Sequence, residues 1–253
     1  MAEANTRGPC LGIIWPDDGR AGPDYEMLRL EAWLVREGLD EGLQVAIGFS
    51  RAARFHTHAD LHVTGSLEAL LPVARDLARR GSGVLVWACT SGSFIGGLEW
   101  ARRQAQALAD AAGVPASSTT LAIIEAARGL GAERLDVLGA YPEPVTRALA
   151  ECLEEAGFAI GAVGWLDAPE GTASFGLDIV AEVRGFAAGI ASSTGSTHPI
   201  VIPDTAINTL ARLSELEAAA GRPVITANWA TLNQGLEMLG LPGLASRRRA
   251  ELR

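Results

Sequence analysis

The stretch GVLVWACTSGSFIGG, residues 83–97, decides how the chain is organised. Residues 84–88 form a short apolar run, which is typical of a buried strand. Ser and Gly residues follow at once, and the sequence of residues 98–112 predicts a helix. Cys89 therefore falls at the carboxyl end of a strand, just before the N-terminus of a helix. In open α/β sheets this is the place where ligands bind.

The surroundings of Cys89 favour a functional thiol. Backbone N–H groups and the helix dipole at such a place favour anions, so we expect the thiol to have a lowered pKa and to be reactive. The hydroxyl-bearing Thr90, Ser91 and Ser93 crowd around it, as in functional sites. The alternative is a buried, inert cysteine.

Length and composition indicate a globular protein of one large domain or two lobes. The chain has 253 residues, of which 48% are hydrophobic. No apolar run reaches the ~18 residues of a membrane span, and the first ten residues lack the core of a signal peptide. Three widely spaced cysteines argue against a disulfide framework. We therefore expect a cytoplasmic protein without a membrane partner.

Several kinds of chemistry are excluded or disfavoured by the residues present. A net charge of −9 argues against a nucleic-acid partner. The chain contains no lysine, which removes Schiff-base chemistry and the phosphate-loop lysine. No Gly-x-Gly-x-x-Gly follows a strand, so no dinucleotide cofactor is expected. His56, His58 and His62 could bind a metal, but only Asp60 lies near them in ligand spacing, and we favour a loop without metal.

Strands and helices alternate along the whole chain, which predicts mainly parallel sheets covered by helices. The pattern of residues 11–112 starts again at residue 134. In each half a third strand ends in a polar residue before a helix, and Cys89 and Asp204 occupy that same place. If a pseudo-twofold relates the halves, both residues face one cleft.

These residues also carry a resemblance to a known family. The segment VWACTSGSFIGG resembles the first active-site motif of the aspartate/glutamate racemase superfamily, and is most similar to the maleate cis–trans isomerase and arylmalonate decarboxylase branch. The resemblance implies an α/β fold of two pseudo-symmetric Rossmann-like lobes with parallel sheets and an interlobe active-site cleft. It also implies no cofactor or metal, a small carboxylic-acid substrate, and a homodimer or homotetramer. The expected boundaries are an N-terminal lobe 1–115 with Cys89, a C-terminal lobe 116–226 with Asp204, and a helix and tail 227–253 returning to the N-terminal lobe.

The resemblance assigns roles to individual residues. Cys89 matches the first cysteine, and Thr90 and Ser91 match residues that hold a substrate carboxylate. The segment IVIPDTAIN matches the second-cysteine motif, with Asp204 in the place of that cysteine and Thr205 as the Thr after it.

Three further substrate-binding residues are expected from their positions. Tyr141 matches a tyrosine that contacts a carboxylate in maleate isomerases. Asp17 lies in a PDDG turn where that branch carries an Asn for the substrate. Asn228 follows the last strand of the chain.

The departures from the family pattern limit the possible mechanisms. A two-thiol racemase mechanism is not available, because Cys10 and Cys152 do not fit the second position. Arylmalonate decarboxylases keep the second cysteine of the family, and in this chain Asp204 stands in its place. Asp17 and Asp18 would repel a dicarboxylate in a poorly solvated site. Either they point to solvent, or the substrate carries an amide or a cation there.

The favoured hypothesis is an isomerase in which the Cys89 thiolate adds to the double bond of a small cis-unsaturated acid. Asp204 then acts as an acid/base or orients the substrate, unless it only caps the following helix. A racemase or epimerase using Cys89 and Asp204, and an arylmalonate-type decarboxylase or lyase, are the alternatives. The last alternative is a non-catalytic binding protein of the same fold.

Overall fold

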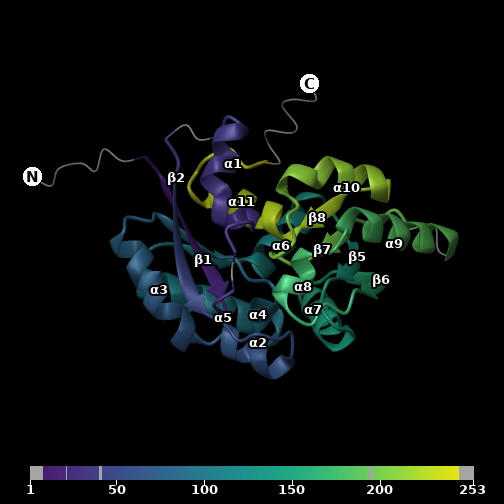
Figure 1. The fold of residues 1–253 in the computed structure, drawn as a ribbon, viewed down its shortest axis with the longest axis horizontal. Helices are drawn as coiled ribbons and strands as arrows, with labels where there is room; N and C mark the ends of the chain where they lie inside the picture. The colour runs from purple at the N-terminus through teal and green to yellow at the C-terminus, as the bar shows by residue number, and fades with distance from the viewer. Residues whose placement is uncertain (1–7, 21, 40–41, 194–195, 245–253) are drawn as a thin grey trace, which may run out of the picture.

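Two parallel four-stranded sheets form the centre of the molecule in the computed structural model, which describes residues 8–20, 22–39, 42–193 and 196–244 (Figure 1). The first sheet has the order β2-β1-β3-β4, made of β1 (Cys10–Asp17), β2 (Gln44–Arg51), β3 (Val84–Trp87) and β4 (Ala116–Ser118). The second has the order β6-β5-β7-β8, made of β5 (Arg134–Gly139), β6 (Ala159–Trp165), β7 (Ile200–Ile202) and β8 (Val224–Thr226).

The two halves repeat the same topology. In each, the first strand lies between the second and the third, the fourth lies beyond the third, and all pairs are parallel. β3 and β7 thus hold equivalent places in the two sheets. The residues that follow them therefore lie at equivalent ends of the two sheets. This confirms the predicted α/β fold of two pseudo-symmetric lobes.

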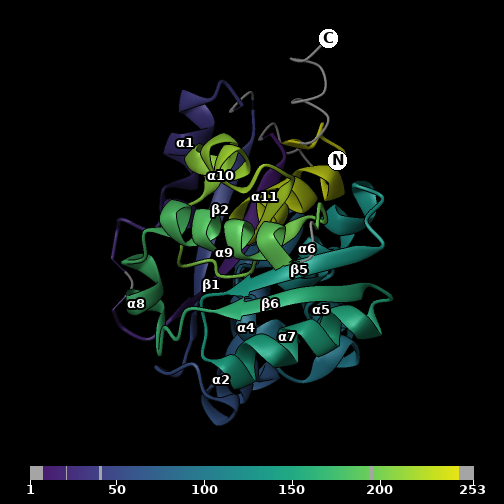
Figure 2. The same cartoon turned by 90° about the vertical axis from the view of Figure 1, so that its right-hand side faces the viewer.

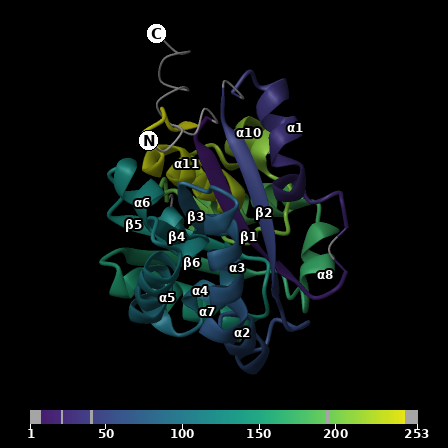
Figure 3. The same cartoon turned by 90° about the vertical axis from the view of Figure 1, so that its left-hand side faces the viewer.

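Helices cover both faces of the first sheet. One face packs against α1 (Leu30–Arg36), which follows the 3₁₀ turn η1 (Glu26–Arg29), and against α11 (Ala227–Met238). The other packs against α3 (Leu67–Arg79) and α5 (Gly97–Ala112), and Figure 3 shows α3 beside β2. Successive side chains of a strand point to opposite faces, so Ile13 joins the first layer and Ile14 the second. This double burial explains the continuous apolar run LGIIW in β1.

The second sheet is covered in the same way. One face packs against α6 (Thr119–Gly129) and α7 (Glu143–Glu155), and the other against α9 (Ile179–Ser193) and α10 (Leu213–Ala220), as Figure 2 shows for α7 and α9. The remaining helical elements are short: α2 (His58–Thr64), α4 (Ser91–Phe94), α8 (Gly171–Phe175) and η2 (Leu210–Arg212).

The last helix of each half packs on the sheet of the other half. α6 follows β4 of the first sheet, yet Ile123 packs with Val137 of the second. α11 follows β8 of the second sheet, yet Leu232 and Leu236 pack with the first. α6 and α11 also pack against each other. At Gly235 a Cβ would lie 2.7 Å from a Leu11 methyl group, so glycine lets α11 approach β1.

The structure refines several expected boundaries. The expected lobe boundary after residue 115 falls just before β4, which pairs with β3 in the first sheet. β4 has only three residues, ASS, which is too short for a strand pattern to appear in the sequence. Residues 227–238 of the expected returning segment do pack on the first sheet, and residues 245–253 lie outside the described residues.

No helix in the described part of the chain is long and apolar enough to cross a membrane.

Candidate active site

Cys89 lies two residues beyond β3, where the chain turns into the one-turn helix α4. The Ala88 amide donates to the Ile14 carbonyl at 2.8 Å, which continues the sheet up to the residue before the thiol. The Ser93 hydroxyl donates to the Cys89 carbonyl at 2.8 Å and so fixes the turn. At Gly92 a Cβ would lie 2.7 Å from the Trp87 ring, so the close turn around the sulfur requires glycine.

The Cys89 thiol is buried, with 5% of the residue exposed. Burial raises the pKa of the thiol to about 12; the Gly92 N–H and the Ser91 hydroxyl oppose this rise, and the charge of Asp204 adds to it. The expectation of a lowered thiol pKa is therefore wrong. The cause is the loss of solvent around the sulfur, which outweighs the two hydrogen bonds that the start of α4 offers it.

Asp204 follows β7 at the equivalent strand end of the second lobe. Its Oδ1 accepts the Ala206 amide at 2.9 Å, which closes a turn. Its Oδ2 is buried and has no hydrogen-bond partner. The expected helix after Asp204 begins only at Leu210, as η2, so Asp204 does not cap a helix. A buried carboxylate oxygen without a donor is costly and points to a ligand or a chemical role.

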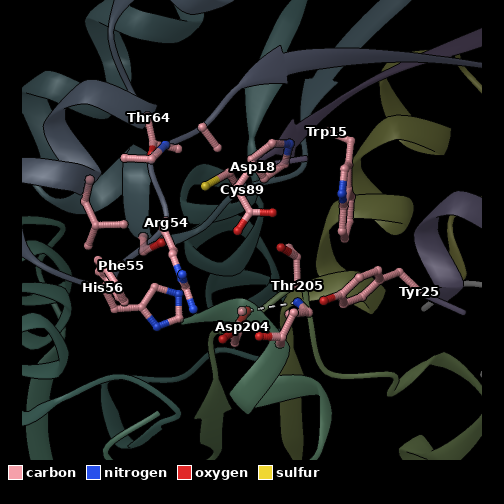
Figure 4. Close-up of a pocket in the computed structure, with 18 residues that line it drawn as sticks. Trp15, Asp18, Tyr25, Arg54, Phe55, His56, Thr64, Cys89, Asp204 and Thr205 are labelled. Carbon is pink, nitrogen blue, oxygen red and sulfur yellow. Dashed lines mark hydrogen bonds between the residues drawn. The ribbon is translucent and has the colours of Figure 1, made fainter. Parts of the chain in front are cut away.

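Cys89 and Asp204 line the same pocket, from opposite lobes. The pocket has a volume of about 90 Å³. Figure 4 shows the two side chains at its upper and lower walls, with Trp15 and Tyr25 at one side and Arg54 and His56 at the other. The arrangement expected from a pseudo-twofold, two strand ends facing one cleft, is thus present.

The structure places some predicted binding residues in this pocket and others behind it. Ser91 and Thr205 line it. Thr90 is buried and does not line the pocket, and its side chain lies close enough to the Tyr141 hydroxyl to oppose the rise in the pKa of Tyr141 that burial causes. Tyr141 is also buried behind the wall and donates to the Pro203 carbonyl at 2.9 Å. Tyr141 therefore fixes the chain just before Asp204.

Asp17 and Asn228 do not line the pocket. The Asp17 carboxylate accepts the Gly19 amide at 2.8 Å within the turn. Asn228 is fully buried, and its Nδ2 donates to the carbonyls of Thr205 and Ile207 at 3.1 and 3.0 Å. Through these hydrogen bonds, Asn228 holds the loop that carries Asp204. Asp18, not Asp17, lines the pocket.

An ion-pair chain at the pocket mouth was not predicted. Arg20 pairs with Asp18 and, at 2.9 Å, with Glu170, which also binds Arg54 at 2.7 Å. These hydrogen bonds lower the pKa of Glu170 to about 2. A backbone bridge joins Phe55 to Glu170 beside them. We call this contact between residues 52–56 and 168–172 the clasp.

Glu26 is a second residue that sequence reasoning missed. Its carboxylate accepts the amides of Thr209 and Leu210 at 2.7 and 2.9 Å and Asn228 Nδ2 at 2.6 Å. Burial raises its pKa, and these donors oppose the rise. Glu26 and Asn228 together hold the loop that carries Asp204. No local pattern signals partners that lie 183 or more residues away.

The three histidines near residue 58 do not form a metal cluster. His56 Nδ1 lies 2.9 Å from the Ala168 carbonyl, and His62 packs edge-on against Trp100. No group of three potential metal ligands occurs in the described residues.

Comparison with known proteins identifies the family. The family model described as arylmalonate decarboxylase matches residues 58–249. The chain belongs to this family. The resemblance to the maleate isomerase and arylmalonate decarboxylase branch is thereby confirmed. No curated protein matches the chain.

Solved structures share the fold at low sequence identity. The maleate isomerase Iso from Pseudomonas putida S16 is 23% identical, with a TM-score of 0.78, over 92% of this chain and 94% of that one. A liganded double mutant of arylmalonate decarboxylase is 21% identical, with a TM-score of 0.77, over 92% and 93%. A mutant Nocardia farcinica maleate cis–trans isomerase with a covalently bound succinylcysteine intermediate is 20% identical, with a TM-score of 0.73, over 92% and 94%.

Proposed function

We propose that this protein is a cofactor-independent isomerase of a small cis-unsaturated carboxylic acid, acting through Cys89. One observation carries the proposal. The Cys89 thiol and the unpartnered Oδ2 of Asp204 border one pocket from opposite lobes. A nucleophile and a proton acceptor on either side of a substrate are what addition to a double bond requires.

The thiol needs a proton acceptor at the moment it reacts. With a pKa of about 12, only about one Cys89 in 10⁵ is ionised at pH 7. Ionisation must therefore accompany addition to the substrate. Asp204 Oδ2 is a carboxylate oxygen that receives no hydrogen bond in the structure, and it is suited to take this proton.

The reaction adds S–H across the double bond and then removes it. Asp204 accepts the thiol proton while the Cys89 sulfur bonds to one alkene carbon, and the proton then passes to the other carbon. The carbon–carbon bond is now single and rotates. Asp204 next removes a proton from that carbon, the C–S bond breaks, and the proton returns to the sulfur. The trans acid leaves.

Two observations support this path. Ser91 lines the pocket with a hydroxyl group that can donate to the carboxylate on which negative charge develops, and Thr205, whose hydroxyl donates to the Ala88 carbonyl, fixes the wall beside it. The succinylcysteine of the Nocardia farcinica enzyme is what addition of a thiol to a four-carbon unsaturated diacid gives. A covalent adduct of the same kind at Cys89 is consistent with the position of its sulfur.

A racemase or epimerase is the second candidate, because the same opposed pair could act on the two faces of one carbon. Such an enzyme would exchange the α-hydrogen of a saturated acid for deuterium in heavy water and would leave cis alkenes unchanged. A decarboxylase, which the matched family model names, would release CO₂.

The test is a panel of cis-unsaturated, saturated chiral and malonic acids incubated in heavy water and followed by NMR. We expect trans alkenes from the wild type, and a loss of at least about 10³-fold with Cys89→Ser. Cys10→Ser makes the same chemical change at a cysteine that does not line the pocket, and should retain activity within about twofold. Full activity of Cys89→Ser would overturn the mechanism.

A further inference from the structure

Besides Cys89 and Asp204, two aromatic rings and a carboxylate line the pocket, and we call Trp15, Tyr25 and Asp18 its aromatic and acidic end. The ring centroids of Trp15 and Tyr25 lie 5.5 Å apart. The ring of Phe175 packs edge-on against Tyr25, with a centroid distance of 5.0 Å. Both pocket rings are buried, with 3% and 8% of the residues exposed. Figure 4 shows the Tyr25 hydroxyl pointing into the pocket toward Thr205.

The cations near this end are already paired. Arg20 binds both Asp18 and Glu170, and Arg54 binds Glu170. Two guanidinium groups are thus matched by two carboxylates. Arg54 is the one arginine that lines the pocket among the described residues, and the charge of Glu170, which accepts from its Nε at 2.7 Å, offsets its own.

Asp204 leaves the pocket with one uncompensated negative charge. The residue is 5% exposed, and its Oδ2 is buried without any donor. A carboxylate oxygen in this state attracts a proton or a positive charge from a group in the pocket.

The two carboxylates act on the same part of the pocket. Burial raises the pKa of the Tyr25 hydroxyl, the charges of Asp204 and then of Asp18 raise it further, and the charge of Arg20 opposes this rise. A second substrate carboxylate beside Tyr25 would meet the uncompensated charge of Asp204, because the charges of Arg20 and Arg54 are already offset by Asp18 and Glu170. A cation there would be attracted by the uncompensated charge of Asp204 and by the two aromatic rings.

We propose that the substrate is a zwitterion, a short unsaturated acid whose end remote from the reacting carboxylate carries an ammonium group. The ammonium group lies against Trp15 and Tyr25 beside Asp18, where the nearby charge of Asp204 attracts it, and Asp204 Oδ2 stays available to take the thiol proton. This inference rests on the proposed function, since it places the carboxylate of the same substrate near Ser91 and Thr205. It decides between the two expectations for the acidic turn, because Asp18 faces the pocket.

The experiment compares matched ligands on the Cys89→Ala variant, which cannot form the covalent adduct. Binding of (Z)-4-aminobut-2-enoate and maleate, and of the saturated pair 4-aminobutanoate and succinate, is measured by calorimetry at pH 7.5. We expect each amino acid to bind at least tenfold more tightly than its dicarboxylate. Turnover of the two unsaturated acids is measured separately with wild-type protein.

Asp18→Asn provides the second arm. It removes a charge from the pocket and releases Arg20 from that carboxylate, so we expect the preference to fall by at least tenfold, with weaker amino-acid binding and tighter maleate binding. Asp24→Asn is the matched control, because Asp24 is exposed and pairs with Arg29 outside the pocket. It should leave the preference unchanged.

The outcomes separate this inference from the proposed function. Maleate binding as tightly as the amino acid, or a preference unaffected by Asp18→Asn, would overturn the zwitterionic substrate while leaving Cys89 chemistry intact. Failure of all four acids to bind would overturn the small-acid site itself, and the proposed function with it.

Discussion

The Thr205 hydroxyl donates a hydrogen bond to the Ala88 carbonyl at 3.2 Å. It thereby joins the residue after Asp204 in one lobe to the residue before Cys89 in the other. The two strand ends that carry the thiol and the carboxylate are linked directly, so their separation does not depend on the helices between them alone.

Removing this link should affect activity more than stability. Thr205→Val keeps the shape of the side chain but leaves the Ala88 carbonyl without its donor, which costs about 1 kcal/mol of unfolding free energy. We expect a fall in kcat of at least about tenfold, because small misplacements of reacting groups are costly. Denaturant titration and steady-state kinetics measure the two effects. Thr205→Ser keeps the hydroxyl and should stay near wild type; equal loss in both variants would contradict this role.

The raised pKa of Cys89 predicts how the free thiol reacts. Alkylation by iodoacetamide requires the thiolate, so its rate should rise about tenfold per pH unit from pH 7 to 10 without a plateau. Asp204→Asn removes a like charge, lowers the thiol pKa and speeds alkylation at each pH. Mass mapping of the modified cysteine provides the measurement. A rate that levels off before pH 10 would show an ordinary or lowered pKa and would contradict this prediction.

Glu26 should contribute to stability through the Asp204 loop. Glu26→Ala leaves the amides of Thr209 and Leu210 and the Asn228 side chain without their acceptor, which we expect to lower the unfolding free energy by about 2–4 kcal/mol. Chemical denaturation measures the loss. Glu37→Ala, at an exposed carboxylate, should change it by less than about 0.5 kcal/mol.

The pH dependence of Glu26 has a definite sign. Because its pKa in the folded state is raised, its contribution is fully present below the unfolded pKa near 4.5 and is lost as the pH rises through the folded pKa. Wild type should therefore lose some stability above pH 4.5 that Glu26→Gln does not lose. The same pH profile in both proteins would contradict this.

The clasp should depend on the charge of Glu170. Glu170→Gln weakens its pairing with Arg20 and Arg54, so we expect faster amide hydrogen exchange in residues 52–56 and 168–172. The pKa of Glu170 is lowered to about 2, so its contribution is present above pH 4.5 and is lost as the pH falls toward 2. Glu143→Gln, on the surface of α7, is the control. Unchanged exchange in the clasp of Glu170→Gln would show that the backbone bridge alone holds it.

The sequence by itself determined the repeat of strands and helices and the residue at each strand end. Apolar runs, turns and helical periodicity are local properties, so they place Cys89 after β3 and Asp204 after β7 without knowledge of the packing. The motif around Cys89 likewise indicated the family, because a short sequence fixes how one strand turns into one helix.

Only the tertiary structure decided the electrostatics of the pocket. Arg20 and Glu170 are separated by 150 residues, and Glu26 and Asn228 by 202. The pKa of Cys89 depends on how much solvent both lobes exclude, and the choice of Asp18 over Asp17 depends on which way one turn faces the other lobe. Burial and charge pairing are sums over everything near a group in space, so no stretch of sequence contains them.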